Sequence, residues 1–391
     1  MSSAGKHVKE VRKRRGLTQH GLAEASGVSL SIIRKLEQGE RETARLETLR
    51  KLAVALRVPT MRLSDGPRPE GPREGTEERW GAVRAALEQP PLRLESDDDL
   101  PTVEGVRTSL AVEALPLYAA HRFSALAEVL APMLRDAEAL GDSGRRVRVR
   151  LLQLAGGAMV HTRQFGAAET ALRRALDDAG DRMEGAATVN TMCWLLLRKG
   201  ELDTAYDLAV KWADDIEPRI SRATPTELSA WGSMLLRVSA AAIRNSQTGQ
   251  ADDALRLARS AAVMLGREHA PESENLRAFG PTTVKLKAAE NASVADRPDA
   301  VLRLAESISP LSLKATTSSN RNRHLLDVAH AHARTRQYSE AFGKLEQIRE
   351  DSPEWLPNQR YARDILAKIL KSRRTLTADM RTMADVVGLP L

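Results

Sequence analysis

The sequence is poor in cysteine and aromatic residues, and it lacks a long apolar run. Its single cysteine, Cys193, excludes a disulfide within the chain. Neither an apolar stretch of about 18 residues nor a secretory leader is present, so we expect a cytoplasmic protein with no membrane partner. Only 3% of the 391 residues are aromatic, whereas strong helix formers dominate. The composition therefore predicts an all-α fold, and the length predicts more than one domain.

Positive charge is concentrated at the amino terminus. Residues 1–63 contain 14 Lys and Arg against 6 Asp and Glu, a net charge of +8. Residues 64–391 contain 45 basic and 46 acidic side chains, a net charge of −1. This asymmetry points to a polyanionic partner for the first domain alone.

The basic segment carries start and stop residues of short helices. Thr18 is a good N-cap for a helix that stops at Gly27, and Ser29 is a good N-cap for one that stops at Gly39. Two short helices joined by a Gly-Val-Ser turn are typical of a helix-turn-helix. Helices are predicted over 6–15, 19–25, 30–37 and 46–57, the last closing a small core through Leu49, Leu52, Ala53 and Leu56.

The stretch GLTQHGLAEASGVSLSIIRKLEQG, followed by LETLRKLAVALRVP, resembles the Cro/repressor (XRE) family of helix-turn-helix proteins. The match in type and spacing includes Gln19, Gly27, Ile33 and Glu37. The family usually has a better helix former where this chain has Gly21. The resemblance implies a lambda-repressor-like bundle and double-stranded DNA as the partner.

In this motif the second helix of the pair enters the major groove. Ser31, Arg34 and Lys35 face away from Ile33 and Leu36, so they are candidates for base contact. By resemblance, Gln19 binds a phosphate and braces this helix, while Ser29 is a helix cap as well as a candidate contact. Arg12, Arg15 and Arg41 would add affinity that falls with salt. The complete set of predicted DNA-binding residues is Gln19, Ser29, Leu30, Ser31, Arg34, Lys35 and Arg41.

Proline, glycine and charge are concentrated over 64–78, and a second irregular stretch follows Pro90. We therefore expect a helix-turn-helix domain over 1–63, a linker with one short helix over 64–103, and a helical domain over 104–391.

The carboxy-terminal domain contains a degenerate repeat. Alternate predicted helices share an alanine register at Ala168, Ala205, Ala254, Ala300 and Ala341. Twelve residues before each lies a small residue of the preceding helix: Gly156, Cys193, Ala242, Ala288 and Ala329. Small residues at both positions let antiparallel helices pack closely, so these segments resemble tetratricopeptide (TPR) repeats over 105–370. A helical bundle without a groove is the alternative architecture.

Stacked helix pairs of this kind build a superhelix with a concave binding face. By analogy with TPR repeats, that face is lined by the first helix of each pair, at Gln153, Asn190, Trp194, Ser239, Lys285, Arg323 and His330. Asn190 and Lys285 could grip a peptide backbone or a carboxylate, with Trp194 as an apolar anchor. The predicted ligand-binding residues are Asn190, Trp194, Lys285, Arg323 and His330.

No motif predicts catalysis, a cofactor or a metal site. A phosphate-binding loop, a paired-histidine zinc motif and a nucleophile elbow are all missing from the sequence. His324, His330 and His332 are spaced so that they do not share one helix face.

The two halves together resemble XRE regulators of Gram-positive bacteria that carry tetratricopeptide-like repeats and respond to secreted peptides in quorum sensing. The resemblance implies a homodimeric transcription regulator, which the Ala- and Arg-rich usage places in an actinobacterium, with a peptide or small molecule as effector and half-sites about 34 Å or a multiple apart. One alternative is a DNA-bound adaptor whose repeats dock a partner protein. The other is an enzyme regulated by DNA.

Overall fold

The computed structural model describes residues 3–15, 17–40, 44, 46–56, 58, 63, 76–88, 101–271, 278–373 and 375–391. The described elements are helices, apart from an isolated antiparallel bridge between His269 and Phe279. The predicted all-α class is therefore confirmed. Within the described ranges, no helix has both the length and the apolar character needed to cross a bilayer.

The amino-terminal bundle has the four predicted helices. Leu22, Ile33, Leu36 and Leu52 are fully buried in its core, so each helix contributes its apolar stripe to one small centre. Thr18 caps the second helix by accepting from the backbone N–H of Gly21 at 2.9 Å. The helices are α1 (Ser3–Arg14), α2 (Gln19–Ser26), α3 (Leu30–Gln38) and α4 (Leu46–Ala55).

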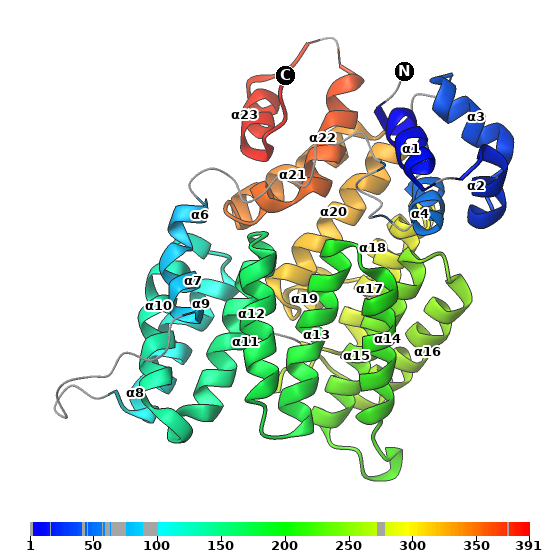
Figure 1. Ribbon diagram of the computed structural model, residues 1–391. Helices are drawn as coiled ribbons and strands as arrows, with labels where there is room; N and C mark the ends of the chain where they lie inside the picture. Colours follow the sequence, from blue (N-terminus) through cyan, green and yellow to red (C-terminus); the bar gives the residue numbers. More distant parts are fainter. Residues whose placement is uncertain are drawn as a thin grey trace.

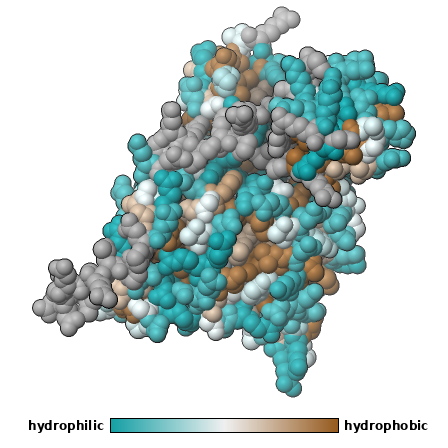
Figure 2. Space-filling view, viewed as in Figure 1, coloured by the Kyte–Doolittle hydropathy of each residue, from teal (hydrophilic) through white to brown (hydrophobic). Residues whose placement is uncertain are grey.

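Most of the described residues beyond the bundle form an array of antiparallel helix pairs (Figure 1). Figure 2 shows hydrophilic residues over most of the visible surface and a group of hydrophobic residues over the middle of the array. The pairs are α11 (Arg145–His161) with α12 (Phe165–Asp177), α13 (Arg182–Lys199) with α14 (Leu202–Asp215), α15 (Pro225–Arg244) with α16 (Thr248–Leu265), α17 (Pro281–Val294) with α18 (Pro298–Glu306), and α20 (Ser318–Arg334) with α21 (Tyr338–Asp351).

Further helices cover the two ends of the array. The short helix expected inside the linker buries Trp80 and Val83 in the core formed with α10 to α12, and we propose that it belongs to the array. At the first end are α6 (Thr76–Arg79), α7 (Gly81–Glu88), α8 (Val103–Ser109), α9 (Leu115–Ala119) and α10 (Phe123–Ala139); near the other are α19 (Pro310–Lys314), α22 (Arg360–Lys371) and α23 (Ala378–Val387).

The helix pairs share one turn geometry. A residue with positive φ stands two residues before α10 and two residues before the second helix of each pair: His121, Arg163, Gly200, Ser246, Asp296 and Arg336. Placing the chain in the left-handed region stops the first helix there, and the next N–H bonds back to a carbonyl five residues earlier, as Gln164 does to Met159 at 2.8 Å.

This turn corrects the repeat register predicted from the alanines. Five residues after it stand Leu126, Ala168, Ala205, Ala251, Val301 and Ala341, and each is at most 1% exposed. The matching buried residues of the first helices are Ala114, Gly156, Cys193, Ser239, Ala289 and Ala329. The prediction was therefore correct for three pairs, but it was three residues late at Ala254 and Ala242, and one residue early at Ala300 and Ala288. Alanine-rich helices offer small residues at several neighbouring positions, so composition alone does not fix the register.

Candidate DNA-binding face and ligand cavity

Helix α3 is held in place by its caps and by its apolar side. Ser29 accepts a hydrogen bond from the N–H of Ile32 at 3.4 Å, which makes it the predicted N-cap. Gly27 before it and Gly39 after it have φ of 64° and 80°, a region that costs residues with a Cβ about 1 kcal/mol or more. Ile33 and Leu36 anchor the helix in the core.

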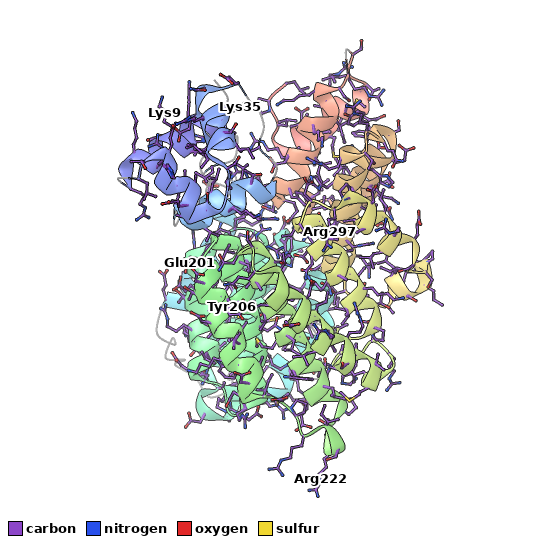
Figure 3. The ribbon with its side chains drawn as sticks, turned by 90° about the vertical axis from the view of Figure 1, so that its right-hand side faces the viewer. Lys9, Lys35, Glu201, Tyr206, Arg222 and Arg297 are labelled. Atoms are coloured by element: carbon purple, nitrogen blue, oxygen red, sulfur yellow. The ribbon has the colours of Figure 1, made fainter. Side chains whose placement is uncertain are left out.

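The opposite side of α3 is free to meet another molecule. Ser31, Arg34 and Lys35 are exposed and Leu30 is half-buried. Figure 3 shows Lys35 and Lys9 of α1 along the upper edge of the bundle. Three predicted base-contacting residues therefore share one exposed face, whereas the predicted contact Arg41 lies outside the described residues.

A buried ion pair ties α1 to α3. Nε and Nη2 of Arg12 donate to the two carboxylate oxygens of Glu37 at 2.7 and 2.8 Å, and Nη1 donates to the carbonyl of Leu17 at 2.8 Å. Gln19 Nε2 donates to Glu37 Oε2 at 2.9 Å. Burial opposes ionisation of Glu37, but these hydrogen bonds from Arg12 and Gln19 hold its pKa below the usual value.

Two predicted phosphate contacts therefore have internal partners. Arg12 is 8% exposed and its guanidinium is committed to Glu37 and Leu17, so it is a core cation and not a surface one. Gln19 braces α3 as predicted, through Glu37. Its predicted phosphate contact stays a prediction, and so do the base contacts of α3.

A cavity of about 390 Å³ opens on the inner side of the array. Its wall comes mainly from the first helices of successive pairs, closed by α22 and by one residue of α4. The polar and aromatic lining residues include Arg50, Tyr118, Gln153, His161, Arg163, Asn190, Trp194, Arg198, Arg237, Arg244, Lys287, Glu290, Ser319, Arg323, Trp355, Arg360, Tyr361 and Asp364.

The lining carries an excess of positive charge. Among the described residues that line the cavity, eight are Lys or Arg and two are Asp or Glu. Burial and the charge of Arg163 lower the pKa of Arg198 to about 9. Burial also lowers the pKa of Lys287, although Glu290 accepts from its Nζ at 2.8 Å. The cavity therefore has more positive charge than its own carboxylates neutralise, a condition that favours an anionic occupant.

One end of the cavity is aromatic. The rings of His161 and Trp194 meet edge to face with centroids 4.6 Å apart. The indole N–H of Trp355 donates to Nδ1 of His161 at 3.1 Å, so the imidazole proton sits on Nε2, facing Ser319 Oγ at 3.2 Å. Burial, with the charge of His121 and Arg198, places the pKa of His161 far below its usual value, and the ring is neutral at pH 7.

Three of the five predicted ligand residues line this cavity. Asn190 accepts from Arg237 Nε at 2.9 Å, and Trp194 forms part of the aromatic end. Arg323 donates from Nε to Asp327 Oδ2 at 3.3 Å and lies over the ring of Tyr361 at 4.9 Å. Burial raises the pKa of Tyr361 and keeps the phenol neutral.

Two predicted ligand residues lie elsewhere. Lys285 is exposed and its Nζ reaches the carbonyl of Ser307 at 3.5 Å. Lys287, two residues further along the same helix, lines the cavity instead. His330 contacts Tyr361, with ring centroids 5.3 Å apart, and does not line the cavity. Ser239, expected on the same face, is buried between helices, where its Oγ donates to the carbonyl of Ala251 at 2.7 Å.

Sequence reasoning missed most of the basic lining. Arg198 and Arg244 each stand five residues after the small packing residue of their helix, and Arg237 and Lys287 each stand two residues before it. The register set by the left-handed turns would have placed these four side chains on the concave face. A pattern of turn residues was therefore the signal that the alanine alignment overlooked.

Comparisons with known proteins identify the amino-terminal domain. Residues 8–63 match the family described as Helix-turn-helix, so this part of the chain is a helix-turn-helix domain, as the motif predicted. The Bacillus subtilis (strain 168) uncharacterized HTH-type transcriptional regulator RghRB is 44% identical over 59 residues, which cover 15% of this chain and 42% of RghRB. The HTH-type transcriptional repressor RghR of the same strain is 41% identical over 59 residues, which cover 15% of this chain and 44% of RghR. The chain thus spans less than half the length of these curated relatives.

The chain is also similar to a solved structure. The crystal structure of Bacillus thuringiensis PlcR in complex with the peptide PapR7 and DNA aligns with a TM-score of 0.37 and 14% sequence identity. The alignment covers 78% of this chain and 94% of that chain.

Proposed function

We propose that this protein is a sequence-specific DNA-binding transcription regulator. The observation that carries the proposal is the helix-turn-helix domain, whose α3 has Ile33 and Leu36 buried while Ser31, Arg34 and Lys35 are exposed. Curated relatives that share 41–44% identity over 59 residues are named as HTH-type transcriptional regulators. Arg34 or Lys35 would read guanine, and surface cations such as Lys9 would contact phosphates.

The double variant Arg34→Ala/Lys35→Ala tests this role. Operator sequences are first selected from random duplexes with the wild-type chain, and binding is then measured by fluorescence anisotropy. Because each good base contact supplies about 1–3 kcal/mol of discrimination, we expect the preference for the selected operator over a scrambled duplex to fall at least tenfold.

The matched control is Arg259→Ala/Arg303→Ala, which removes two exposed cations from α16 and α18. It should retain full discrimination. Unchanged discrimination by the α3 variant, with far-ultraviolet circular dichroism like that of the wild type, contradicts the assignment.

We further propose that the cavity binds an effector that changes how the DNA-binding domains are held in a cytoplasmic homodimer. Support comes from a volume of about 390 Å³, an aromatic end and a polar lining, which are typical of a ligand site. The effector is a peptide or a small molecule, and it acts only if it binds one arrangement of the domains better than the other. A homodimer would place its half-sites about one helical turn, roughly 34 Å, or a multiple apart.

A further inference from the structure

The DNA-binding domain contributes a side chain to the cavity of the array. Arg50 of α4 lines the cavity, and its Nη1 donates to the carbonyl oxygen of Val294 at the end of α17. In Figure 1, α4 is the helix of the bundle that lies next to the array, at the ends of α17 and α18. Arg50 therefore belongs to the DNA-binding domain and can also contact a molecule bound in the cavity of the array.

The charges around Arg50 are predominantly of its own sign. Arg244 and Arg323 of the array repel it, whereas Asp327 is its attractive charged neighbour. Burial and the charge of Arg244 lower the pKa of Arg50 to about 9. Without an added anion, electrostatic repulsion opposes the docking of the guanidinium in this wall.

The carboxylates near Arg50 already have partners. Glu290 accepts from Arg244 and, at 2.8 Å, from Lys287. Lys287, Arg244 and Arg323 overcome the effect of burial and hold the pKa of Glu290 well below its usual value. Asp327 is fully buried against Arg323, and burial raises its pKa. The wall therefore offers guanidinium N–H donors in a site that its own acids do not neutralise.

We propose that Arg50, together with Arg237 and Arg244, binds the anionic group of an amphipathic ligand whose apolar part lies against Trp194 and Trp355. The ligand thereby clamps the helix-turn-helix domain onto the array. The anion is a carboxylate or a phosphate, both of which match the guanidinium fork. This inference rests on the proposed ligand-sensing function of the same cavity.

Because of this clamp, the binding of the ligand and the binding of DNA are thermodynamically linked. A ligand that contacts Arg50 binds the docked position of the domain better than any undocked one, so it shifts the population of DNA-binding arrangements. By reciprocity, operator DNA changes the affinity for the ligand by the same factor. Removal of the Arg50 charge should weaken both the binding and the linkage, while the cavity itself stays intact.

The test uses the full chain and a generic aromatic anion. The probe is 8-anilinonaphthalene-1-sulfonate, and its uncharged relative N-phenyl-1-naphthylamine reports apolar binding alone. Both are titrated by fluorescence into the wild type, Arg50→Gln, Arg237→Gln and the matched control Lys51→Gln, which alters the neighbouring residue of α4 outside the cavity lining.

We expect Arg50→Gln to weaken sulfonate binding about tenfold or more, because a hydrogen bond to a charged group is worth about 1.5–3 kcal/mol. Arg237→Gln should do the same, whereas Lys51→Gln and all titrations of the uncharged probe should stay near wild type.

Two results separate failure of the inference from failure of the proposed function. Weakening by Arg237→Gln but not by Arg50→Gln overturns the clamp and leaves the ligand cavity standing. Equal affinity for the two probes in every variant overturns both. Competition identifies the source of the anion: displacement of the sulfonate by tetraglutamate indicates a carboxylate ligand, and displacement by inorganic phosphate indicates a phosphorylated one.

Discussion

The Glu37 carboxylate shows how one buried side chain positions the proposed recognition helix α3. It is 2% exposed and receives three hydrogen bonds, two from Arg12 and one from Gln19. Because both charged groups of the pair are buried, removing either one leaves the other unpaired in the interior, at a large cost in folding free energy. The orientation of α3 on α1 therefore depends on this pair as well as on apolar packing.

Glu37→Ala should destabilise the amino-terminal domain by about 2–4 kcal/mol, since it leaves Arg12 buried without its carboxylate. The pKa of Glu37 is lowered in the folded chain, so the stabilisation is present above the unfolded value of 4.5 and is lost as pH falls through the folded pKa. Urea unfolding of wild type and variant, followed by circular dichroism at pH 7 and at pH 3, measures both effects. The control Arg12→Met/Glu37→Leu replaces both charged groups, so it should lower the free energy of unfolding by less than Glu37→Ala does. If the free energies of unfolding of the wild type and Glu37→Ala differ by as much at pH 3 as at pH 7, this interpretation is contradicted.

The helix pair is the element that sets the shape of the array. Gly156 of α11 faces Leu172 of α12, and a Cβ added at Gly156 would lie 2.6 Å from the Leu172 side chain. Close approach of these two helices thus depends on a missing methyl group. The buried small residues at matching positions of the other pairs serve the same packing.

Gly156→Ala should therefore destabilise the array by about 1–3 kcal/mol through overpacking, in spite of the better helix propensity of alanine. Gly166→Ala on α12 is the matched control, because no atom lies within 4 Å of its added Cβ. That control should be neutral or stabilising by up to about 1 kcal/mol. Thermal unfolding monitored at 222 nm compares them, and a Gly156→Ala chain as stable as Gly166→Ala would refute the packing argument.

Sequence alone predicted the elements well and their contacts less well. Caps such as Thr18, Ser29 and Gly39 act within a few residues, so the helices of the first domain could be assigned from local chemistry. The charge pairing of Arg12 depends on a residue 25 positions away, which no local pattern reveals. On the array, Lys285 lies outside the cavity lining, whereas Asn190 and Trp194 stand in a helix whose register was predicted correctly, and both line the cavity.

At the scale of the whole molecule, the proposed homodimer requires an interface, and an exposed apolar face of α16 is a candidate for it. Leu257 and Met264 of α16 are 48% and 41% exposed and stand seven residues apart on one helix face. An apolar face of this kind can pair with the same face of a second copy about a two-fold axis.

Leu257→Glu should convert the dimer into a monomer, because a charge at the centre of an isologous apolar contact is buried twice. Light scattering coupled to gel filtration at micromolar concentration measures the state. Val112→Glu, which places the same charge at a 68% exposed position of another element, is the control and should remain dimeric. A wild-type chain that elutes as a monomer at this concentration would exclude the proposed dimer.

The left-handed turn between the helices of each pair has a consequence for how such arrays change in length. The end that carries the turns has a connection of three residues in every copy but one, where Gly200 closes it with two, whereas the opposite end accepts connections as different as those after α12, α14 and α16. Segments grafted at the opposite end should therefore leave the superhelical stacking unchanged, and one inserted residue at a turn should rotate every helix that follows. The array offers one permissive edge for engineering and one at which the spacing between the packing residues of the two helices is fixed.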